Sequence, residues 1–143
     1  RGANNLALIS GDFNALPDST EYRSMTNRGW LDSHLAAAQP ECDSTSGIGC
    51  TSGRASNAQD IENPALHVDT RIDYIFAALP QENNTCVASL ESGRRGRYAI
   101  TDAGLFAAEP NPFAAACGNP PDAVCWISDH SGNQARLTCT PSP

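Results

Sequence analysis

Arg71-Ile72-Asp73-Tyr74-Ile75-Phe76 is the clearest strand of the chain, because the segment is rich in β-branched and aromatic residues. One residue breaks its apolar character, the carboxylate of Asp73. A charge inside a strand is costly to bury unless it is paired. An ion pair with Arg71, or a place on a solvent-facing side, would be the simplest explanation. The alternative is a functional partner elsewhere in the chain, which makes Asp73 the first candidate for a site residue.

Upstream of this strand, the sequence predicts a second strand and a helix. Residues 6–10 form a short apolar run, Leu-Ala-Leu-Ile-Ser, which is typical of a strand buried on both faces. Asp18 and Glu21 have the spacing of a capping box, and the helix that follows from about Ser19 should end near residues 27–29.

The rest of the chain alternates long loops with shorter strand signals. Residues 39–66 are rich in Ser, Gly, Asn and Pro and predict a long loop. Residues 92–123 contain a cluster of arginines and a Pro/Ala-rich stretch, and they predict a second loop insertion. Residues 86–90 and 135–138 have strand character. Strands mixed with one clear helix predict an α/β or α+β layer over residues 1–143.

Cysteine usage indicates an oxidising compartment. The chain has six cysteines and no C-x-x-C pair, which argues against a zinc site built from thiolates. An even count in a loop-rich chain predicts disulfides, and therefore a secreted protein, extracellular or periplasmic. Several pairings are possible in principle, and the short loops favour Cys42–Cys50, Cys117–Cys125 and Cys86–Cys139. Asn83 begins a formal glycosylation sequon, which leaves modification open.

Net charge and hydropathy argue against two classes of protein, non-specific nucleic-acid binders and proteins with a membrane-spanning helix. The net charge of −7 argues against non-specific clinging to nucleic acid, although a nuclease with local, metal-assisted phosphate contacts remains compatible with it. All nine Lys or Arg positions are arginine, which suits bidentate phosphate recognition, although a GC-rich coding bias is the simpler explanation. No apolar run approaches the roughly 20 residues that a membrane-spanning helix needs.

Two further motifs place polar groups beside predicted strands. Gly11-Asp12-Phe13-Asn14 directly follows the first strand, and Ser128-Asp129-His130 precedes the last one. Each motif alone is most often a turn or an ordinary loop. Their joint occurrence with Asp73, in this order, is much rarer than any one of them. The candidate constellation is therefore Asp12, Asn14, Asp73, Asp129 and His130.

Several well-known site patterns do not fit. An EF-hand would need an oxygen side chain and then glycine at the positions that Leu16 and Pro17 occupy after Asp12. The chain has no G-x-S-x-G nucleophile elbow and no H-E-x-x-H zinc motif. Covalent serine hydrolysis of that type and zinc-peptidase chemistry are therefore not expected.

The motifs together resemble the endonuclease/exonuclease/phosphatase superfamily, which includes DNase I-like nucleases, abasic-site endonucleases, sphingomyelinases and inositol-polyphosphate phosphatases. The resemblance rests on residues 10–14, 71–76 and 128–130, and Trp30-Leu31-Asp32 fits the family's helix-to-strand junction. It implies a DNase I-like fold, a four-layer α/β/β/α sandwich built from two similar halves. Residues 1–143 would then be the C-terminal half of that domain.

The resemblance also implies a division of labour within the constellation. Asp12 would activate or position the attacking water and help to bind a divalent metal, and Asn14 would hold that water and the phosphate. Asp129 would bind the metal, usually magnesium, with manganese or calcium as alternatives. His130 would act on the phosphoryl oxygen and would be held in place by Asp73. This agrees with the chemistry of imidazole, which needs a carboxylate on one nitrogen to aim the other.

Other expectations follow from the same resemblance. Arg71 would help to bind the substrate. The metal-binding Asn and Glu of the family's N-terminal half, and its second catalytic His, have no counterpart here, so a missing N-terminal half or a partner chain is expected to complete the domain. His34 and His67 should be surface or loop residues. This segment alone would then be inactive.

Three functions remain open from the sequence. The first is a metal-dependent phosphodiester hydrolase, most commonly an extracellular nuclease. The second is a sphingomyelinase-like lipid phosphodiesterase, for which residues 104–106 and 112–113 would form an apolar loop that touches the membrane. The third belongs to another class, a non-catalytic binding or assembly module that keeps the motifs without a working site.

Overall fold

The computed structural model describes residues 6–54, 63, 65–79, 85–87, 95–106 and 128–141. This part of the chain has two antiparallel sheets of three strands and two short helices, which is an α+β fold, as predicted. The sheets have the strand orders β1-β3-β2 and β4-β5-β6. The elements are β1 (Ala7–Asp12), α1 (Thr20–Thr26), β2 (Leu31–Asp32), α2 (Ser33–Ala36), β3 (Asp73–Ala78), β4 (Thr85–Val87), β5 (Arg95–Phe106) and β6 (Gly132–Pro141).

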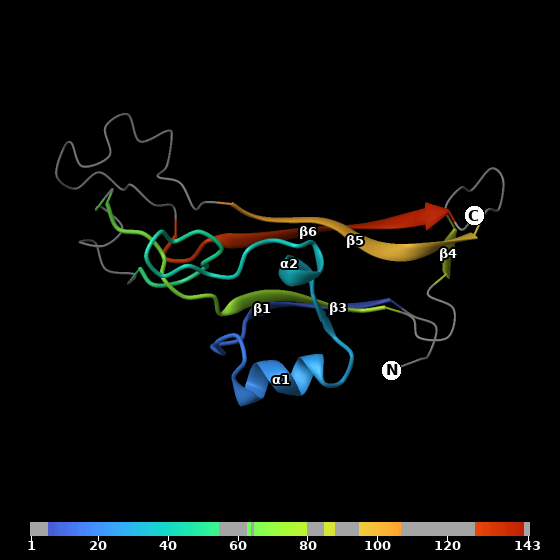
Figure 1. The fold of residues 1–143 in the computed structure, drawn as a ribbon, viewed down its shortest axis with the longest axis horizontal. Helices are drawn as coiled ribbons and strands as arrows, with labels where there is room; N and C mark the ends of the chain where they lie inside the picture. Colours follow the sequence, from blue (N-terminus) through green and yellow to red (C-terminus); the bar gives the residue numbers. More distant parts are fainter. Residues whose placement is uncertain are drawn as a thin grey trace.

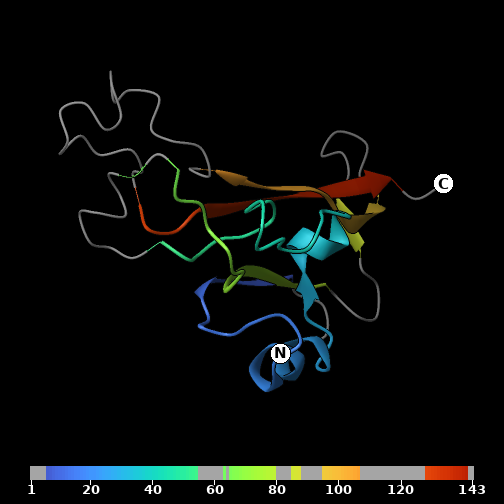
Figure 2. The ribbon, with the colours of Figure 1, turned by 60° about the vertical axis from the view of Figure 1, so that its left-hand side comes forward.

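The two sheets lie one above the other with a short helix between them. In Figure 1 and in the turned view of Figure 2, α1 lies below the β1-β3-β2 sheet and the β5-β6 ladder lies above it. The helix α2 lies between the two sheets and contacts both β3 and β5. This arrangement brings the first residues of β6 against β3, close to where that strand begins.

An aromatic cluster forms the core between α1 and the first sheet. Side chains alternate along a strand, so Tyr74 and Phe76 share one face of β3, where both are buried. They pack on Tyr22 of α1, with ring centroids 5.3 and 5.8 Å away, and on Phe13 from the end of β1. Asp73, one residue before Tyr74, therefore points to the opposite face, away from this core.

The helix α1 begins one residue later than the capping-box spacing suggests. Its N-cap is Ser19, whose Oγ accepts a hydrogen bond from the backbone N–H of Tyr22 (3.2 Å). Asp18 is not the cap because its backbone has a φ of 65°, which places it in the turn before the helix. The helix ends at Thr26, with Asn27 as the C-cap, within the predicted region.

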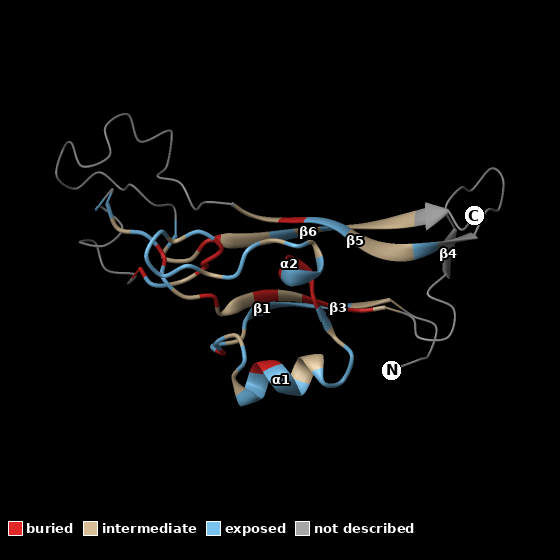
Figure 3. Cartoon of the chain, viewed as in Figure 1, coloured by how far each residue is buried: buried red, intermediate tan, exposed pale blue. Residues whose placement is uncertain are grey.

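The strand β1 is exposed, whereas the sequence predicted burial on both faces. Leu8 and Ile9 are 54% and 42% exposed, and Figure 3 shows most of the strand in the colour of exposed residues. The physical reason is position: β1 is an edge strand, paired only with β3, and it lies at the rim of the first sheet. The predicted apolar run does form a strand, but no other segment in the described part of the chain packs over it.

The predicted second insertion, residues 92–123, contains the longest strand of the described chain. β5 pairs antiparallel with β6, from Gly96 opposite Pro141 to Phe106 opposite Gly132, with one irregularity between Ile100 and Asp102. The sequence did not indicate this strand because its polar and apolar residues do not alternate regularly. Of the predicted loop at 39–66, residues 39–54 have turns and no helix, as expected.

Arg71 is buried inside the fold and holds three elements together. Its guanidinium donates to Asp32 at the end of β2 (2.7 Å) and to both oxygens of Glu41 in the following loop (2.6 and 2.7 Å). It also lies over the ring of Tyr74. Burial alone would lower the pKa of Arg71, but the hydrogen bonds and charges of Glu41 and Asp32 outweigh it and raise the pKa.

The burial and pairing of Arg71 favour a structural role over the predicted substrate-binding role, which stays a prediction. Its side chain is 1% exposed, and each guanidinium nitrogen already has a carboxylate partner. Burial would raise the pKa of Glu41, yet the hydrogen bonds from Arg71 and from the Cys42 N–H lower it below its usual range. Burial and the neighbouring Asp32 raise the pKa of Tyr22, whose hydroxyl donates to that carboxylate, to about 12. The cluster is a structural ion network.

Replacing Arg71 tests this structural role. Arg71→Met should lower the free energy of unfolding by about 3 kcal/mol, because Asp32 would stay buried without its cation. Urea unfolding measures the change. The matched control is Arg23→Met, which removes an exposed ion pair with Asp18 and should leave the midpoint almost unchanged. Equal midpoints for the two variants would contradict a structural role for Arg71.

Candidate active site

The pairing of β1 with β3 places two carboxylates opposite each other. The ladder ends with Asp12 directly across from Asp73. Asn14, in the left-handed region at φ 48°, turns the chain back so that its backbone N–H donates to Asp12 Oδ1 (2.7 Å) and its amide donates to Asp12 Oδ2 (3.4 Å). Asparagine tolerates this conformation better than most residues. Asp12 is thus oriented by Asn14, while Phe13 between them anchors the turn in the aromatic core.

His130 forms the predicted hydrogen bond with Asp73. Its Nδ1 lies 2.9 Å from Asp73 Oδ2, and both side chains are mostly buried. An ionised carboxylate can only accept a hydrogen bond, so Nδ1 carries the proton and Nε2 of the neutral ring keeps its lone pair. The Nε2 atom lies 3.3 Å from Ser52 Oγ. The carboxylate therefore fixes the tautomer and aims the opposite nitrogen of the ring.

Asp12, Asp73 and His130 form one group whose ligand atoms all lie within 4.8 Å of one another. Carboxylate oxygens are the ligands that Mg²⁺ and Mn²⁺ favour, with water completing the coordination, and an imidazole is also acceptable to Mn²⁺. The donor set therefore fits a divalent cation. The same three groups, a fixed imidazole beside two carboxylates, also suit proton transfer at a phosphoryl group.

A cavity of about 220 Å³ lies beside this group. Its walls come from β1, β3 and the start of β6, including Gly11, Asp73 and Asn133. The side-chain amide of Asn133 donates to the backbone oxygen of Asp73 (2.9 Å), which ties β6 to the start of β3. Asp73 therefore lines an open space rather than solid packing.

Asp129 lies apart from this group. It does not belong to the set of ligand atoms that Asp12, Asp73 and His130 form, and one of its oxygens accepts a hydrogen bond from Ser128 Oγ (3.3 Å). The charge of Asp129 acts instead on the buried Arg54. Burial lowers the pKa of Arg54 below its usual value, and the nearby negative charge of Asp129 offsets part of this shift. The structure thus brings together Asp12, Asp73 and His130, and Asn14 is joined to them by its hydrogen bonds to Asp12. Asp129, the fifth residue of the constellation, lies near Arg54 instead.

Two residues of the site were missed from the sequence. Thr51 is fully buried and its Oγ1 accepts hydrogen bonds from the N–H groups of Ile72 (3.1 Å) and Asp73 (3.2 Å). Ser52 contacts His130, as described above. Both residues lie in a loop rich in Ser, Thr and Gly, where nothing in the local composition distinguishes them from their neighbours.

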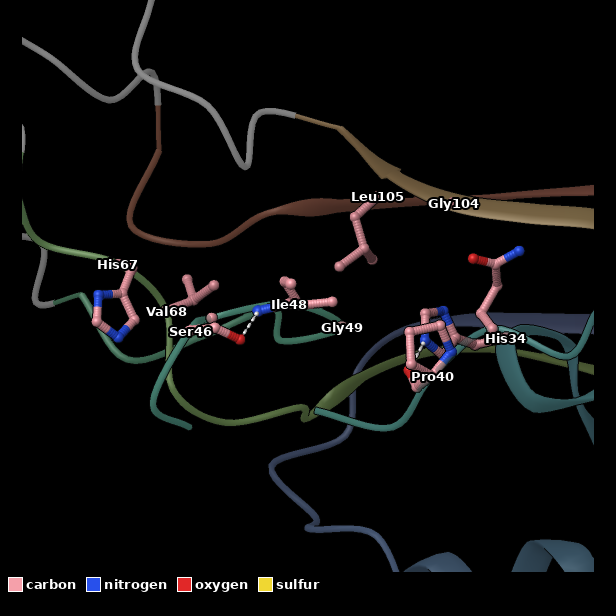
Figure 4. Close-up of a pocket in the computed structure, with 11 residues that line it drawn as sticks. His34, Pro40, Ser46, Ile48, Gly49, His67, Val68, Gly104 and Leu105 are labelled. Atoms are coloured by element: carbon pink, nitrogen blue, oxygen red, sulfur yellow. Dashed lines mark hydrogen bonds between the residues drawn. The ribbon is translucent and has the colours of Figure 1, made fainter. Parts of the chain in front are cut away.

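A larger hollow, of about 270 Å³, lies elsewhere, between the 46–49 loop and β5 (Figure 4). His34 and His67 both line it, and Leu105 reaches it from β5. His67 is exposed in a loop, as predicted. His34 is not a surface residue: it is 6% exposed in α2, because its Nε2 donates to the Pro40 carbonyl (2.7 Å) between the sheets.

Cys42 and Cys50 form a disulfide that closes the loop immediately before Thr51. Cys139 on β6 is also disulfide-bonded, but its partner lies outside the described side chains. The predicted pairs Cys86–Cys139 and Cys117–Cys125 therefore remain predictions. A disulfide is consistent with an oxidising, extracellular environment.

The chain belongs to the Endonuclease/Exonuclease/phosphatase family, whose model matches residues 1–130. The match spans all three motifs, and it assigns the fold to the DNase I-like class. Enzymes of this family are hydrolases of the phosphodiesterase, nuclease and phosphatase type and generally depend on a divalent metal. No curated protein and no solved structure matches the chain. In the described residues, neither helix is long and apolar enough to cross a membrane.

The rings of His130 and His34 should have opposite tautomers. His130 donates from Nδ1 to a carboxylate, whereas His34 donates from Nε2 to a carbonyl, and neither acceptor can donate back. Long-range ¹H–¹⁵N spectra at a pH where both rings are neutral should therefore assign Nδ1–H to His130 and Nε2–H to His34. Finding Nε2–H on both rings would contradict the Asp73–His130 geometry.

Proposed function

We propose that this chain carries part of the active site of a divalent-metal-dependent phosphodiester hydrolase, which in its complete form is an extracellular nuclease. The observation that supports this best is the 2.9 Å hydrogen bond between Asp73 and His130, with Asp12 within ligand distance of both. A buried carboxylate needs a partner, and an imidazole held in this way can act at a phosphoryl oxygen. Membership of the family supplies the reaction class.

In the proposed reaction, each residue does what its position allows. Asp12, held by Asn14, positions the attacking water and accepts its proton as the water oxygen bonds to phosphorus. The bond from phosphorus to the leaving-group oxygen breaks, and that oxygen takes up a proton from solvent. The ring of His130, once protonated at Nε2, donates a hydrogen bond to a non-bridging phosphoryl oxygen in place of its contact with Ser52, and Asp73 stabilises the charged ring. A divalent metal held by Asp12 together with groups outside this chain would stabilise charge on the phosphate oxygens. Asp129, predicted as a second ligand, lies outside the group that Asp12 forms in the structure. Magnesium is the expected ion, with manganese or calcium as alternatives.

Nucleic acid is the preferred substrate over a phospholipid. The lipid alternative needed residues 104–106 to form an apolar loop at a membrane. In the structure Gly104 and Leu105 are part of β5, paired with Gln134 and Asn133, and they line the hollow between the sheets. This part of the proposed membrane loop is therefore a paired, half-buried strand and not a free loop. The rest of that loop, Pro112 and Phe113, lies outside the described residues.

We also propose that a second segment, the N-terminal half of the same domain or a partner chain, completes the enzyme. The apolar side chains of β1, Leu8 at 54% and Ile9 at 42% exposure, are the support for this. Exposed apolar edge strands are unfavourable in water and tend to pair with another chain. The family's remaining metal ligands would come from the same segment.

Asp73→Asn tests the catalytic role in the complete polypeptide. The amide no longer fixes the Nδ1–H tautomer of His130, so turnover should fall by at least about 100-fold with unchanged folding. The matched control is Asp102→Asn on β5, which should keep full activity. Release of nucleotides from DNA and of phosphocholine from sphingomyelin, both with Mg²⁺, separates the substrates. Release of phosphocholine alone would favour the lipid enzyme, and no turnover of either by the wild type would favour a binding module.

The need for a second segment has its own test. Residues 1–143 expressed alone should hydrolyse DNA at least about 100-fold more slowly than the complete polypeptide, because the metal-binding groups outside the chain are lost. Adding the upstream segment in trans should restore part of the activity. Robust Mg²⁺-dependent turnover by residues 1–143 alone would overturn this proposal.

A further inference from the structure

Thr51 is hydrogen-bonded to the backbone next to both members of the Asp73–His130 pair, although it belongs to none of the sequence motifs. It is fully buried. Its Oγ1 accepts hydrogen bonds from the backbone N–H groups of Ile72 (3.1 Å) and Asp73 (3.2 Å). Its carbonyl oxygen accepts a third, from the N–H of Ser131 (2.8 Å). One residue thus holds both the first residue of β3 and the residue that follows His130.

The limited length of β2 explains why a side chain is needed at this place. β2 pairs only with Phe76 and Ala77, so it does not reach Asp73. The backbone N–H of Asp73 donates to Thr51 Oγ1, and its carbonyl accepts from the Asn133 amide. Buried backbone groups need such partners, because an unpaired one costs about as much as a lost hydrogen bond. Side chains therefore replace the missing strand where the proposed site lies.

Thr51 is itself held firmly from the other side. Its N–H donates to the carbonyl of Thr70 (2.7 Å), and the neighbouring Ser52 forms a β-bridge with the same residue. Cys50, which directly precedes it, is fully buried and disulfide-bonded to Cys42. The hydroxyl is therefore a fixed reference point, and the position of Asp73 depends on it.

We propose that Thr51 is a positioning residue for the hydrolysis: its hydroxyl sets Asp73 so that the carboxylate meets His130 Nδ1. The effect on turnover rests on the proposed function, whereas the effect on the Asp73–His130 hydrogen bond does not. Without the hydroxyl, the N–H groups of Ile72 and Asp73 lose their acceptor, and the start of β3 must shift to find another. A displacement of about 1 Å at a catalytic group is enough to lower the rate by about 100-fold.

The test compares variants that keep or lose this hydroxyl in the complete polypeptide. Thr51→Val keeps the shape and removes the acceptor; kcat for DNA should fall about 10- to 100-fold, as for other residues that orient a functional side chain, with KM changed less than about 2-fold. Thr51→Ser keeps the acceptor and should stay within about 3-fold of the wild type. Thr101→Val is the control, because its hydroxyl donates to the Arg136 carbonyl on β6 and not to the loop of residues 50–54, and it should retain kcat.

A second readout is independent of activity. The hydrogen-bonded Nδ1–H of His130 should give a proton resonance protected from exchange with water in the wild type and in Thr51→Ser. In Thr51→Val it should exchange markedly faster. If the wild type lacks turnover but this difference is present, the proposed function fails and the positioning role stands.

Three outcomes would overturn the role of Thr51. They are wild-type behaviour of Thr51→Val in both readouts, equal losses in Thr51→Val and Thr51→Ser, and a similar loss in Thr101→Val. If Thr51→Val does not fold, Thr51→Ala replaces it, since Ala and Ser both lack the methyl group and only Ala lacks the hydroxyl. Equal behaviour of Ala and Ser would then overturn the proposal.

Discussion

The register between β1 and β3 is the constraint on which the rest of the candidate site depends. It sets Asp12 opposite Asp73 at the end of the ladder. Because side chains alternate along a strand, a slip of one residue would move Asp73 into the aromatic core and Tyr74 out of it. The burial of Tyr74 and Phe76 against α1 therefore fixes the register. The same packing that stabilises the first sheet places the two carboxylates.

Arg71 and Asp73 lie only two residues apart, but Arg71 belongs to a structural ion network and Asp73 belongs to the candidate site. Arg71 is buried and neutralised by Asp32 and Glu41. Asp73 therefore does not need Arg71 as a partner and is available to His130, which comes from the far end of the chain. If Arg71 were paired with Asp73, it would compete with the imidazole for that carboxylate. The ion network thus supports the site by keeping the arginine occupied elsewhere.

The loop around residues 50–54 joins the elements that carry the motifs. Thr51 and Ser52 bond to β3, to the 128–131 turn and to His130, and the Cys42–Cys50 disulfide constrains the loop just before them. Hydrogen bonds in a buried site must be satisfied by whatever segment is close. Here the loop of residues 50–54 supplies them, although its composition does not distinguish it from its neighbours, because β2 is too short to reach Asp73.

The sequence alone determined the α+β class, the strand at 71–76 and the helix after Ser19, since each rests on local periodicity or capping. The sequence also showed, through the cost of burying a charge, that Asp73 needs a partner, which the family resemblance implied to be His130. It also indicated the family through the motifs at 10–14, 71–76 and 128–130. Only the tertiary structure decided the burial of Arg71 and His34, the exposure of β1, the length of β5 and the place of Thr51. Those features depend on which segments, distant in sequence, come to lie together, and local composition carries no record of that.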